Sequence, residues 1–363
     1  MKFHKLFSFT LAAFFLAASF IALPSARADQ GREIFLLDIP HRDINGIFLD
    51  SSLNRSLLPT GKLGKLVFTP IDQPRSWLID GALIEDVQTL SQSNISAQNW
   101  LEALTVNSSQ DPVFALPYGH PDITPLNKLA VKELSYYFEA SRIILQKNLG
   151  REVQINHSIN WSAGTSRIPT AAARAYLANR NALQLMRTLV PASQLNELRS
   201  KLAFLLTPGL SYTRQLLLAK QTSNAVNENT HKLRIVPGKY HLTSSKEKVP
   251  LTLVNDFPTP ITVNLQLIPL NSRIQISDIH QVILEARSKT QILLPVSVIA
   301  SGSTSVIAQF INSQGERINE SVLLTLSASV ITPAVAWFTT GAAILLFLAA
   351  LTQSIRRIRR SRK

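Results

Sequence analysis

Side chains with acid–base capacity follow several short apolar runs of this 363-residue chain. Asp80 ends the run SWLID, and Tyr118, His120 and Asp122 follow VFAL within the stretch PVFALPYGHPDITPL. A carboxylate and an imidazole that meet in one cleft can exchange a proton with a substrate or bind a divalent metal ion. Asp80, His120 and Asp122 are therefore candidate catalytic residues.

Four further residues are candidates for ligand binding. Asp38 ends the run EIFLLD and His41 follows it, Tyr118 precedes His120, and His157 follows EVQIN. The nature of any metal stays open, because no spacing matches a metal motif such as H-E-x-x-H. The sequence also contains no phosphate loop, dinucleotide fingerprint or G-x-S-x-G elbow, so we predict no cofactor. A structural alternative remains, since Asp and His are common helix caps and turn formers and Asp122 shortly precedes a predicted helix.

The elements that must position these residues alternate between strands and helices. The predicted strands are Glu33 to Asp38, Gly46 to Asp50, Lys65 to Thr69, Ser76 to Asp80, Pro112 to Leu116 and Glu152 to Asn156. The predicted helices are Ser96 to Thr105, Leu126 to Leu149, Thr170 to Leu189, Ser193 to Leu206 and Ser211 to Ala225. This alternation favours a parallel sheet with helical crossovers, and the candidate residues lie at the carboxyl ends of its strands, where ligands bind in such folds. Residues 29–226 are short for a complete eight-stranded barrel, so we predict an incomplete (β/α) barrel or an open parallel sheet.

The pattern changes near residue 230. The polar segment Lys220 to Lys232 is typical of a linker, and residues 227–329 then contain short alternating runs separated by turns. The first two runs, Val249 to Val254 and Ile261 to Leu267, flank a Pro-rich turn and predict a hairpin. About seven strands of this kind predict an immunoglobulin-like β-sandwich.

The two ends of the chain predict its topology. Lys2 and Lys5 precede an apolar run that closes on Ala26-Arg27-Ala28, which is the layout of a secretory signal peptide over residues 1–28, with an uncleaved anchor as the alternative. Residues 330–351 carry no charge and are long enough for one transmembrane helix. Residues 352–363 form a basic tail, which by the positive-inside rule is cytoplasmic. The sequence therefore predicts a single-pass type I plasma-membrane protein with residues 29–329 outside.

Topology also changes the meaning of the net charge. Of the total of +14, the tail supplies six charges and the signal peptide three, which leaves +5 for residues 29–329. The basic composition therefore does not indicate a nucleic-acid partner, and we predict none. The chain contains no cysteine, which excludes disulfides, thiol catalysis and cysteine–metal sites.

Several segments, in order, resemble an uncharacterised actinobacterial family of secreted proteins with one C-terminal membrane anchor. They are GIFLDSSLNRSLLPTGKLGKL, SWLIDGALIEDVQTLS, AQNWLEAL, VFALPYGHPDITPLNKLA and VPLTLVNDFPTPITVNLQL, followed by the apolar segment and the Arg-rich tail. The Pro-Tyr-Gly-x-Pro-Asp turn is the most specific of these, and many members have aspartate where this chain has His120.

That resemblance implies a cell-envelope protein, because such proteins are commonly encoded next to the lipid II flippase homologue. It implies a binding or scaffold role near peptidoglycan synthesis, with a cell-wall polymer or a wall-synthesis membrane protein as partner, and it supplies no catalytic residues. A carbohydrate-active hydrolase or deacetylase using Asp80, His120 and Asp122 is the alternative hypothesis, and a structural spacer or adhesion protein is a third.

Overall fold

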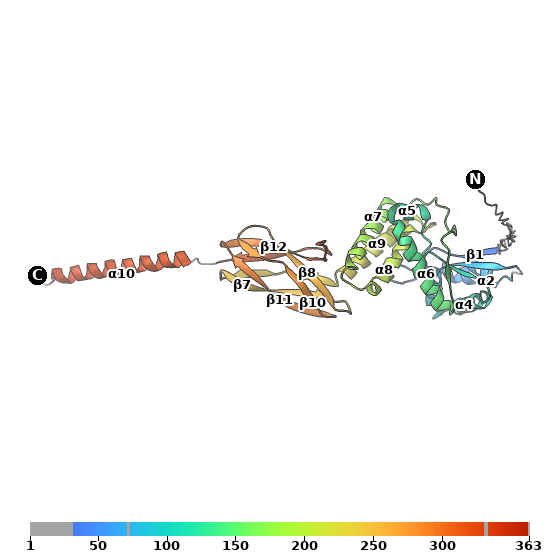
Figure 1. Ribbon diagram of the computed structural model, residues 1–363, viewed down its shortest axis with the longest axis horizontal. Helices are drawn as coiled ribbons and strands as arrows, with labels where there is room; N and C mark the ends of the chain where they lie inside the picture. The colour runs from blue at the N-terminus through green and yellow to red at the C-terminus, as the bar shows by residue number, and fades with distance from the viewer. Residues whose placement is uncertain (1–31, 71–72, 330–332, 362–363) are drawn as a thin grey trace, which may run out of the picture.

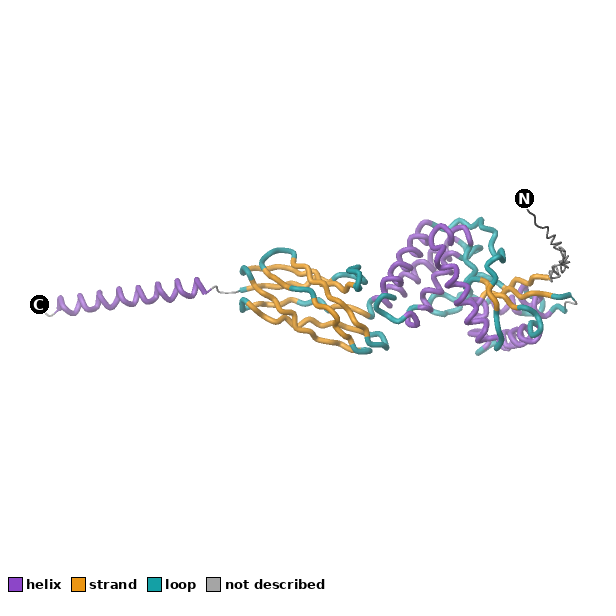
Figure 2. The backbone as a smooth tube through the Cα atoms, viewed as in Figure 1, coloured by secondary structure: helices purple, strands orange, loops and turns teal. Residues whose placement is uncertain are grey.

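A computed structural model describes residues 32–70, 73–329 and 333–361 of the chain. Figures 1 and 2 show an elongated molecule in which an α/β unit, a layer of helices, a β-sandwich and one long helix follow one another. The predicted signal peptide, residues 1–28, lies outside the described residues.

The α/β unit is built on a four-stranded sheet. Its strands are β1 (Arg32–Leu36), β2 (Arg75–Asp80), β3 (Val113–Leu116) and β4 (Gln154–Ile155). All three pairings are parallel, and the spatial order β1-β2-β3-β4 follows the chain. Of the two predicted alternatives, the described residues form the open parallel sheet, and no closed barrel is present among them.

The two faces of this sheet are covered differently. Trp77 and Ile79 on β2 point into a core shared with helices, whereas Leu78 points the other way and packs with Leu116 and Ile159. The helices of that core are α1 (Ser52–Leu57), α2 (Lys62–Phe68), α3 (Gly81–Ser91), α4 (Ile95–Asn107) and α6 (Leu134–Leu149). One face therefore carries most of the helical packing, and the other face has a small cluster.

Two predicted strands of this unit are wrong. Residues Lys65 to Thr69 belong mainly to helix α2, because Leu63 and Val67 lie one helical turn apart and are both fully buried. A short apolar run does not distinguish a strand from a buried helix. Gly46 to Asp50 is a loop with one isolated bridge, since Asp43 accepts a hydrogen bond from the Ile47 amide and turns the chain there.

The helical layer follows the sheet. It consists of α5 (Ile123–Ala130), η1 (Val131–Glu133), α7 (Thr170–Met186), η2 (Ala192–Gln194), α8 (Asn196–Lys201), η3 (Leu202–Leu206) and α9 (Tyr212–Thr230). The predicted linker, Lys220 to Lys232, is wrong, because α9 continues to Thr230. Its buried stripe includes polar Thr222 and Asn229 beside Leu218 and Val226, so the segment is too polar to be recognised as a packed helix from composition.

A two-sheet β-sandwich follows, as predicted. One sheet has the order β10-β8-β12-β13-β6 and the other β5-β7-β11-β9. The strands are β5 (Leu233–Ile235), β6 (Lys239–Leu242), β7 (Lys246–Asn255), β8 (Ile261–Pro269), β9 (Ile274–Ile276), β10 (Ile279–Leu284), β11 (Ser288–Val298), β12 (Gly302–Ile311) and β13 (Val322–Ala328).

The predicted hairpin at the start of the sandwich is wrong. Strand β7 pairs with β5 and β11, whereas β8 pairs with β10 and β12, so the Pro-rich turn carries the chain from one sheet to the other. The buried Asn255 organises this crossing. Its side chain accepts a hydrogen bond from the Phe257 amide and donates to the carbonyls of Leu284 and Glu285.

The last element is α10 (Pro333–Ser361). Its segment Trp337–Ser354 has a mean hydropathy of 1.4, and none of it is buried against the rest of the chain. By length and composition this helix can cross a membrane once.

Candidate functional site

Asp80 and His120 meet, as their positions at adjacent strand ends predict. Asp80 Oδ2 lies 2.8 Å from His120 Nδ1, and Asp80 Oδ1 accepts hydrogen bonds from the amides of Ala82 and Gly119, each at 2.9 Å. Asp80 is fully buried and His120 is 2% exposed. The aspartate therefore caps helix α3 and fixes the turn after β3, and both of its oxygens are already in use.

The turn from Pro117 to Asp122 is held from the other side by η3. Gly119 has φ +68°, and a Cβ atom there would lie 2.9 Å from the Phe204 ring. His120 also has a positive φ, of 34°, and the Thr207 hydroxyl donates to the Gly119 carbonyl. Such a backbone persists only where its surroundings enforce it, and here the contacts with Phe204 and Thr207 hold the segment in this conformation.

Asp122 does not join the Asp80–His120 pair. Its carboxylate caps α5 by accepting from the Thr124 amide at 3.0 Å, and it accepts from the Ser166 amide at 2.9 Å. Burial alone would raise the pKa of Asp122, but the hydrogen bonds from Ser166 and Thr124 hold that pKa below its usual value. The arrangement of all three candidate catalytic residues thus favours the structural alternative.

The second predicted group, Asp38 and His41, is also brought together. His41 Nε2 lies 3.4 Å from Asp38 Oδ2, and His41 Nδ1 lies 3.2 Å from the Ser52 hydroxyl. Burial alone would raise the pKa of Asp38, but the His41 imidazole and the Lys62 ammonium hold it below its usual value. The His41 amide donates to Asp86, which ties this loop to α3.

The remaining two candidates lie apart from these pairs. His157 is exposed, and its ring packs edge-on against Phe138 with 4.7 Å between the centroids. Tyr118 lies at the bottom of a surface groove between helices α3, α6 and α8, which we call the α3–α6–α8 groove. Among the seven predicted site residues, Tyr118 alone lines this groove.

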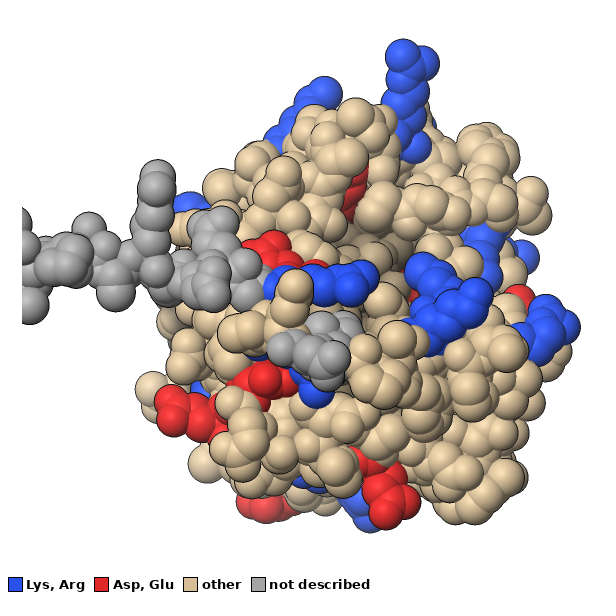
Figure 3. Space-filling view, turned by 90° about the vertical axis from the view of Figure 1, so that its right-hand side faces the viewer, with Lys and Arg blue, Asp and Glu red and all other residues tan. Residues whose placement is uncertain are grey.

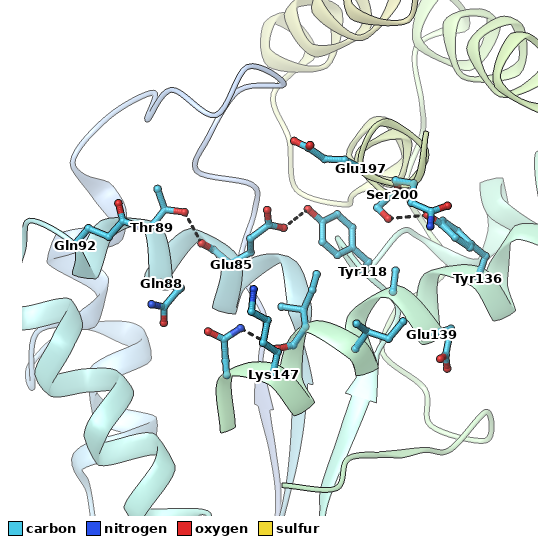
Figure 4. Close-up of a pocket in the computed structure, with 15 residues that line it drawn as sticks. Glu85, Gln88, Thr89, Gln92, Tyr118, Tyr136, Glu139, Lys147, Glu197 and Ser200 are labelled. Carbon is cyan, nitrogen blue, oxygen red and sulfur yellow. Dashed lines mark hydrogen bonds between the residues drawn. The ribbon is translucent and has the colours of Figure 1, made fainter. Parts of the chain in front are cut away.

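The α3–α6–α8 groove has a volume of about 910 Å³. This is the upper part of the size range of small-molecule sites. Figure 4 shows Glu85 and Tyr118 at its centre, Glu197 and Ser200 along one side and Lys147 below. Its lining residues are Glu85, Gln88, Thr89, Gln92, Tyr118, Tyr136, Glu139, Ala140, Ile143, Ile144, Lys147, Asn148, Asn196, Glu197 and Ser200.

Glu85, in the centre, is held in place from two sides. The Tyr118 hydroxyl donates to Glu85 Oε2 at 2.8 Å, and an Arg42 nitrogen lies 3.4 Å from Oε1. Burial, reinforced by the neighbouring Glu85 carboxylate, raises the pKa of Tyr118 well above its usual value, so the phenol remains a donor at any physiological pH. The Glu85 side chain keeps about a third of its surface exposed and can accept a hydrogen bond from a ligand.

Arg42 connects this carboxylate to a buried one. Its Nε donates to Asp86 Oδ1 at 2.6 Å, and Asp86 is 4% exposed at its side chain. Burial raises the pKa of Asp86 despite the opposing effect of Arg42. The loop that carries Arg42 is therefore fixed beneath the groove by an ion pair, as well as by Lys201, whose ammonium donates to the Ile44 carbonyl and to Glu197.

Most residues of this groove are absent from the sequence-based prediction. One signal could have found part of it, because Glu85, Gln88, Thr89 and Gln92 recur at the spacing of one helix face within GALIEDVQTLSQ. That pattern alone equally describes an ordinary solvent-facing stripe. Only the tertiary structure places α6 and α8 opposite it.

Charges of both signs occur at the end of the molecule that carries the sheet. Figure 3 shows basic and acidic side chains scattered among uncharged surface on the part of that face which grey atoms do not cover. Within residues 32–70, 73–329 and 333–361 there is no group of three or more His, Asp or Glu side chains placed to hold a metal ion. The groove lining combines the charged side chains of Glu85, Glu139, Lys147 and Glu197 with uncharged hydrogen-bonding, aromatic and aliphatic side chains.

The model of a family of unknown function, DUF6049, matches residues 161–363 of the chain. The chain belongs to this family. The matched part includes α7 to α9, the β-sandwich and α10, whereas the parallel sheet and most of the groove precede it. No curated protein matches the chain.

Solved structures are similar to the chain over about a quarter of its length. A C. elegans MSP family member, WR4, is 6% identical and covers 27% of this chain and 98% of its own, with a TM-score of 0.21. The E. coli chaperone DraB is 14% identical over 28% of this chain and 56% of its own, with a TM-score of 0.21. A PapD-like domain of human CEP192 is 13% identical over 28% of this chain and 85% of its own, also with a TM-score of 0.21. At such TM-scores these similarities carry no inference about function.

Proposed function

We propose that the chain is a single-pass protein of the cell envelope whose extramembrane part acts as a binding or scaffold module. The observation that carries this proposal is the separation of an unpacked apolar helix, α10, from a folded unit with a ligand-sized groove. The β-sandwich lies between them (Figure 1). In the proposed arrangement it holds the α/β unit away from the membrane.

The orientation follows from the ends of the sequence. The basic residues 352–363 directly follow the apolar segment and favour a cytoplasmic tail, and the predicted signal peptide favours export of the other end. In this orientation the groove faces the outside of the cell, and the pairing of a folded ectodomain with a single anchor suits a protein that presents a binding surface.

The site of action follows from the resemblance to the anchored actinobacterial family. Its association with the lipid II flippase homologue supports a place beside the peptidoglycan synthesis machinery, with a wall polymer or a membrane protein of that machinery as partner. The hydrolase or deacetylase hypothesis gains no support from the geometry, because Asp80, His120 and Asp122 are buried and serve as caps and turn anchors.

The absence of native cysteine makes the topology directly testable. Ser313→Cys lies on an exposed turn of the sandwich and Ser361→Cys lies in the basic tail beyond the apolar segment, so each gives a chain with one thiol. A membrane-impermeant maleimide applied to intact cells should label the Ser313→Cys chain and leave the Ser361→Cys chain unlabelled until the cells are lysed. Labelling in the reverse order would show that the proposed orientation is wrong.

The partner is testable in the same way. A photo-activatable cross-linker attached to the thiol of Gln92→Cys, on the rim of the groove, should capture a wall polymer or a wall-synthesis membrane protein in growing cells. The same cross-linker at Gln110→Cys, exposed outside the groove, is the control. Identical captured products from the two positions would count against a partner bound at the groove.

A further inference from the structure

The chemistry of the α3–α6–α8 groove identifies a class of ligand. We propose that this groove binds a linear, uncharged oligosaccharide, with its hydroxyl groups toward α3 and the C–H faces of its rings toward α6. This deepens the proposed function, on which it rests only in assuming that the folded unit is a binding module.

The α3 wall supplies hydrogen bonds. Gln88 and Gln92 are exposed, are one helical turn apart, and have no side-chain hydrogen-bond partner among the described residues. Each amide offers donors and an acceptor, which is what a sugar hydroxyl requires because it both donates and accepts. Glu85 lies on the same stripe as a fixed acceptor, oriented by Tyr118.

The α6 wall supplies apolar contact. Ala140, Ile143 and Ile144 form an aliphatic strip, and Ile143 is 54% exposed. An exposed isoleucine in a groove gains stability when an apolar surface covers it. A sugar ring is amphipathic, with C–H groups on its faces and hydroxyls at its edges, so it satisfies both walls at once.

The charges of the groove indicate an uncharged ligand. Three carboxylates line it, and each is paired with a base just outside the lining. Glu85 lies 3.4 Å from Arg42, Glu139 2.5 Å from Arg142, and Glu197 2.6 Å from Lys201. Lys147, the remaining charged residue of the lining, has no ion pair among the described residues and leaves one isolated positive charge. Neither a polyanion nor a polycation therefore finds an extended field of one sign in the groove.

The walls argue against a peptide. A peptide strand binds by adding to the free edge of a sheet, but this groove is walled by helices, whose backbone groups bond within the helix. A peptide helix needs a continuous apolar groove, whereas the aliphatic part here is one short strip facing a polar wall.

The groove has room for several sugar units. From Glu85 to Gln92 the α3 wall extends ~10 Å, and from Tyr136 to Asn148 the α6 wall extends ~18 Å, at the helical rise per residue. The groove is therefore long enough for a segment of a linear oligosaccharide.

The test is a titration of the full-length chain, purified in a detergent without a sugar headgroup, with chitotetraose, cellotetraose and maltotetraose. Binding is measured by saturation-transfer NMR and its Kd by calorimetry. At least one of these probes should bind, and Gln88→Ala combined with Gln92→Ala should weaken it roughly tenfold through the loss of two amide contacts.

Asn99→Ala, the loss of an exposed amide on α4 outside the groove, is the matched control and should leave the Kd unchanged. All three positions are exposed, and thermal unfolding verifies that each variant folds. The proposal is overturned if no probe binds at millimolar concentration, if the double variant binds as well as the native chain, or if an unstructured peptide binds where the sugars do not. Because detergent-solubilised protein has no orientation, a failure here is distinct from a failure of the topology test.

Discussion

The α/β unit and the β-sandwich are stabilised by different kinds of buried group. The sandwich core is made of alternating apolar residues on paired strands, such as Leu251 and Leu253 on β7 and Val263 and Leu265 on β8. The α/β unit has a comparable apolar core but also buries ionisable side chains, including Asp80 with His120 and Asp86 with Arg42.

The two units differ in what determines the path of their backbone. In the sandwich, the backbone ladders and the alternation of side chains fix which face is buried. The α/β unit must also hold irregular loops at the strand ends, where backbone groups have no ladder to join. Buried carboxylates there accept several amide hydrogen bonds at once and so determine the path of the loop.

Turns in both units use one buried polar side chain as an organiser. Asp80 binds the turn after β3, and Asn255 binds the crossing between β7 and β8. The aspartate is an ionisable residue with a histidine partner, whereas the asparagine cannot ionise and bonds to backbone groups. Loss of a partner should therefore cost most stability in the α/β unit.

The sharpest test of this contrast is Arg42→Met. It leaves Asp86 buried without its cation, which we expect to lower the free energy of unfolding by roughly 3–5 kcal/mol. Urea unfolding of the full chain, followed by tryptophan fluorescence, measures this loss of stability in the α/β unit. Trp77, Trp100 and Trp161 lie in the α/β part, and the sandwich contains no tryptophan.

Arg234→Met is the matched control, because Arg234 and Asp256 form an ion pair that is 41% and 49% exposed. Its free energy of unfolding, measured by far-UV circular dichroism, should fall by less than about 1 kcal/mol. Equal losses for the two variants would remove the distinction between the units.

A smaller effect is expected from Gly119→Ala relative to Gly150→Ala. Both glycines have φ near +65°, so both variants share a backbone cost of about 1–2 kcal/mol. At Gly119 the added methyl group also meets the Phe204 ring, whereas at Gly150 it meets nothing within 4 Å. The Gly119 variant should therefore lose roughly 1–3 kcal/mol more, again measured by tryptophan fluorescence.

That comparison decides whether the turn after β3 is a rigid structural element. If the two variants lost the same stability, η3 would yield to the methyl group and the turn could move. A mobile turn would revive the catalytic hypothesis for His120.

The smallest expected effect concerns Asp122 and pH. Asp122→Ala removes the cap of α5 and should cost about 1 kcal/mol at pH 7. Since the folded-state pKa of Asp122 is lowered, its contribution is complete above the unfolded pKa of about 3.9 and is lost as pH falls through the folded pKa. The difference in free energy of unfolding between the variant and the native chain, measured by urea titration, should therefore become smaller as the pH is lowered below about 3.9.

Ser211→Ala provides a cap that does not titrate. Ser211 caps α9 by accepting a hydrogen bond from the Arg214 amide. Loss of this cap should therefore lower the free energy of unfolding by a similar amount at pH 7 and at acidic pH. A constant difference for Asp122→Ala over the same pH range would contradict the role of its ionised carboxylate.

The sequence by itself determined the features that depend on local pattern. Period-two alternation predicted the sandwich strands, and the uncharged stretch of residues 330–351 predicted a membrane-length helix. Both predictions depend on hydrophobic period and segment length, which are properties of consecutive residues.

The tertiary structure alone decided the features that depend on distant partners. The run at Lys65 is a helix because its apolar residues face Trp100, whose indole donates to the Leu63 carbonyl. The chain after Asn255 changes sheet because carbonyls from β10 and the turn beyond it accept hydrogen bonds from that side chain. The groove likewise needs α8 to lie against α6 and across from α3, and this arrangement of segments distant in the chain is encoded by no local pattern.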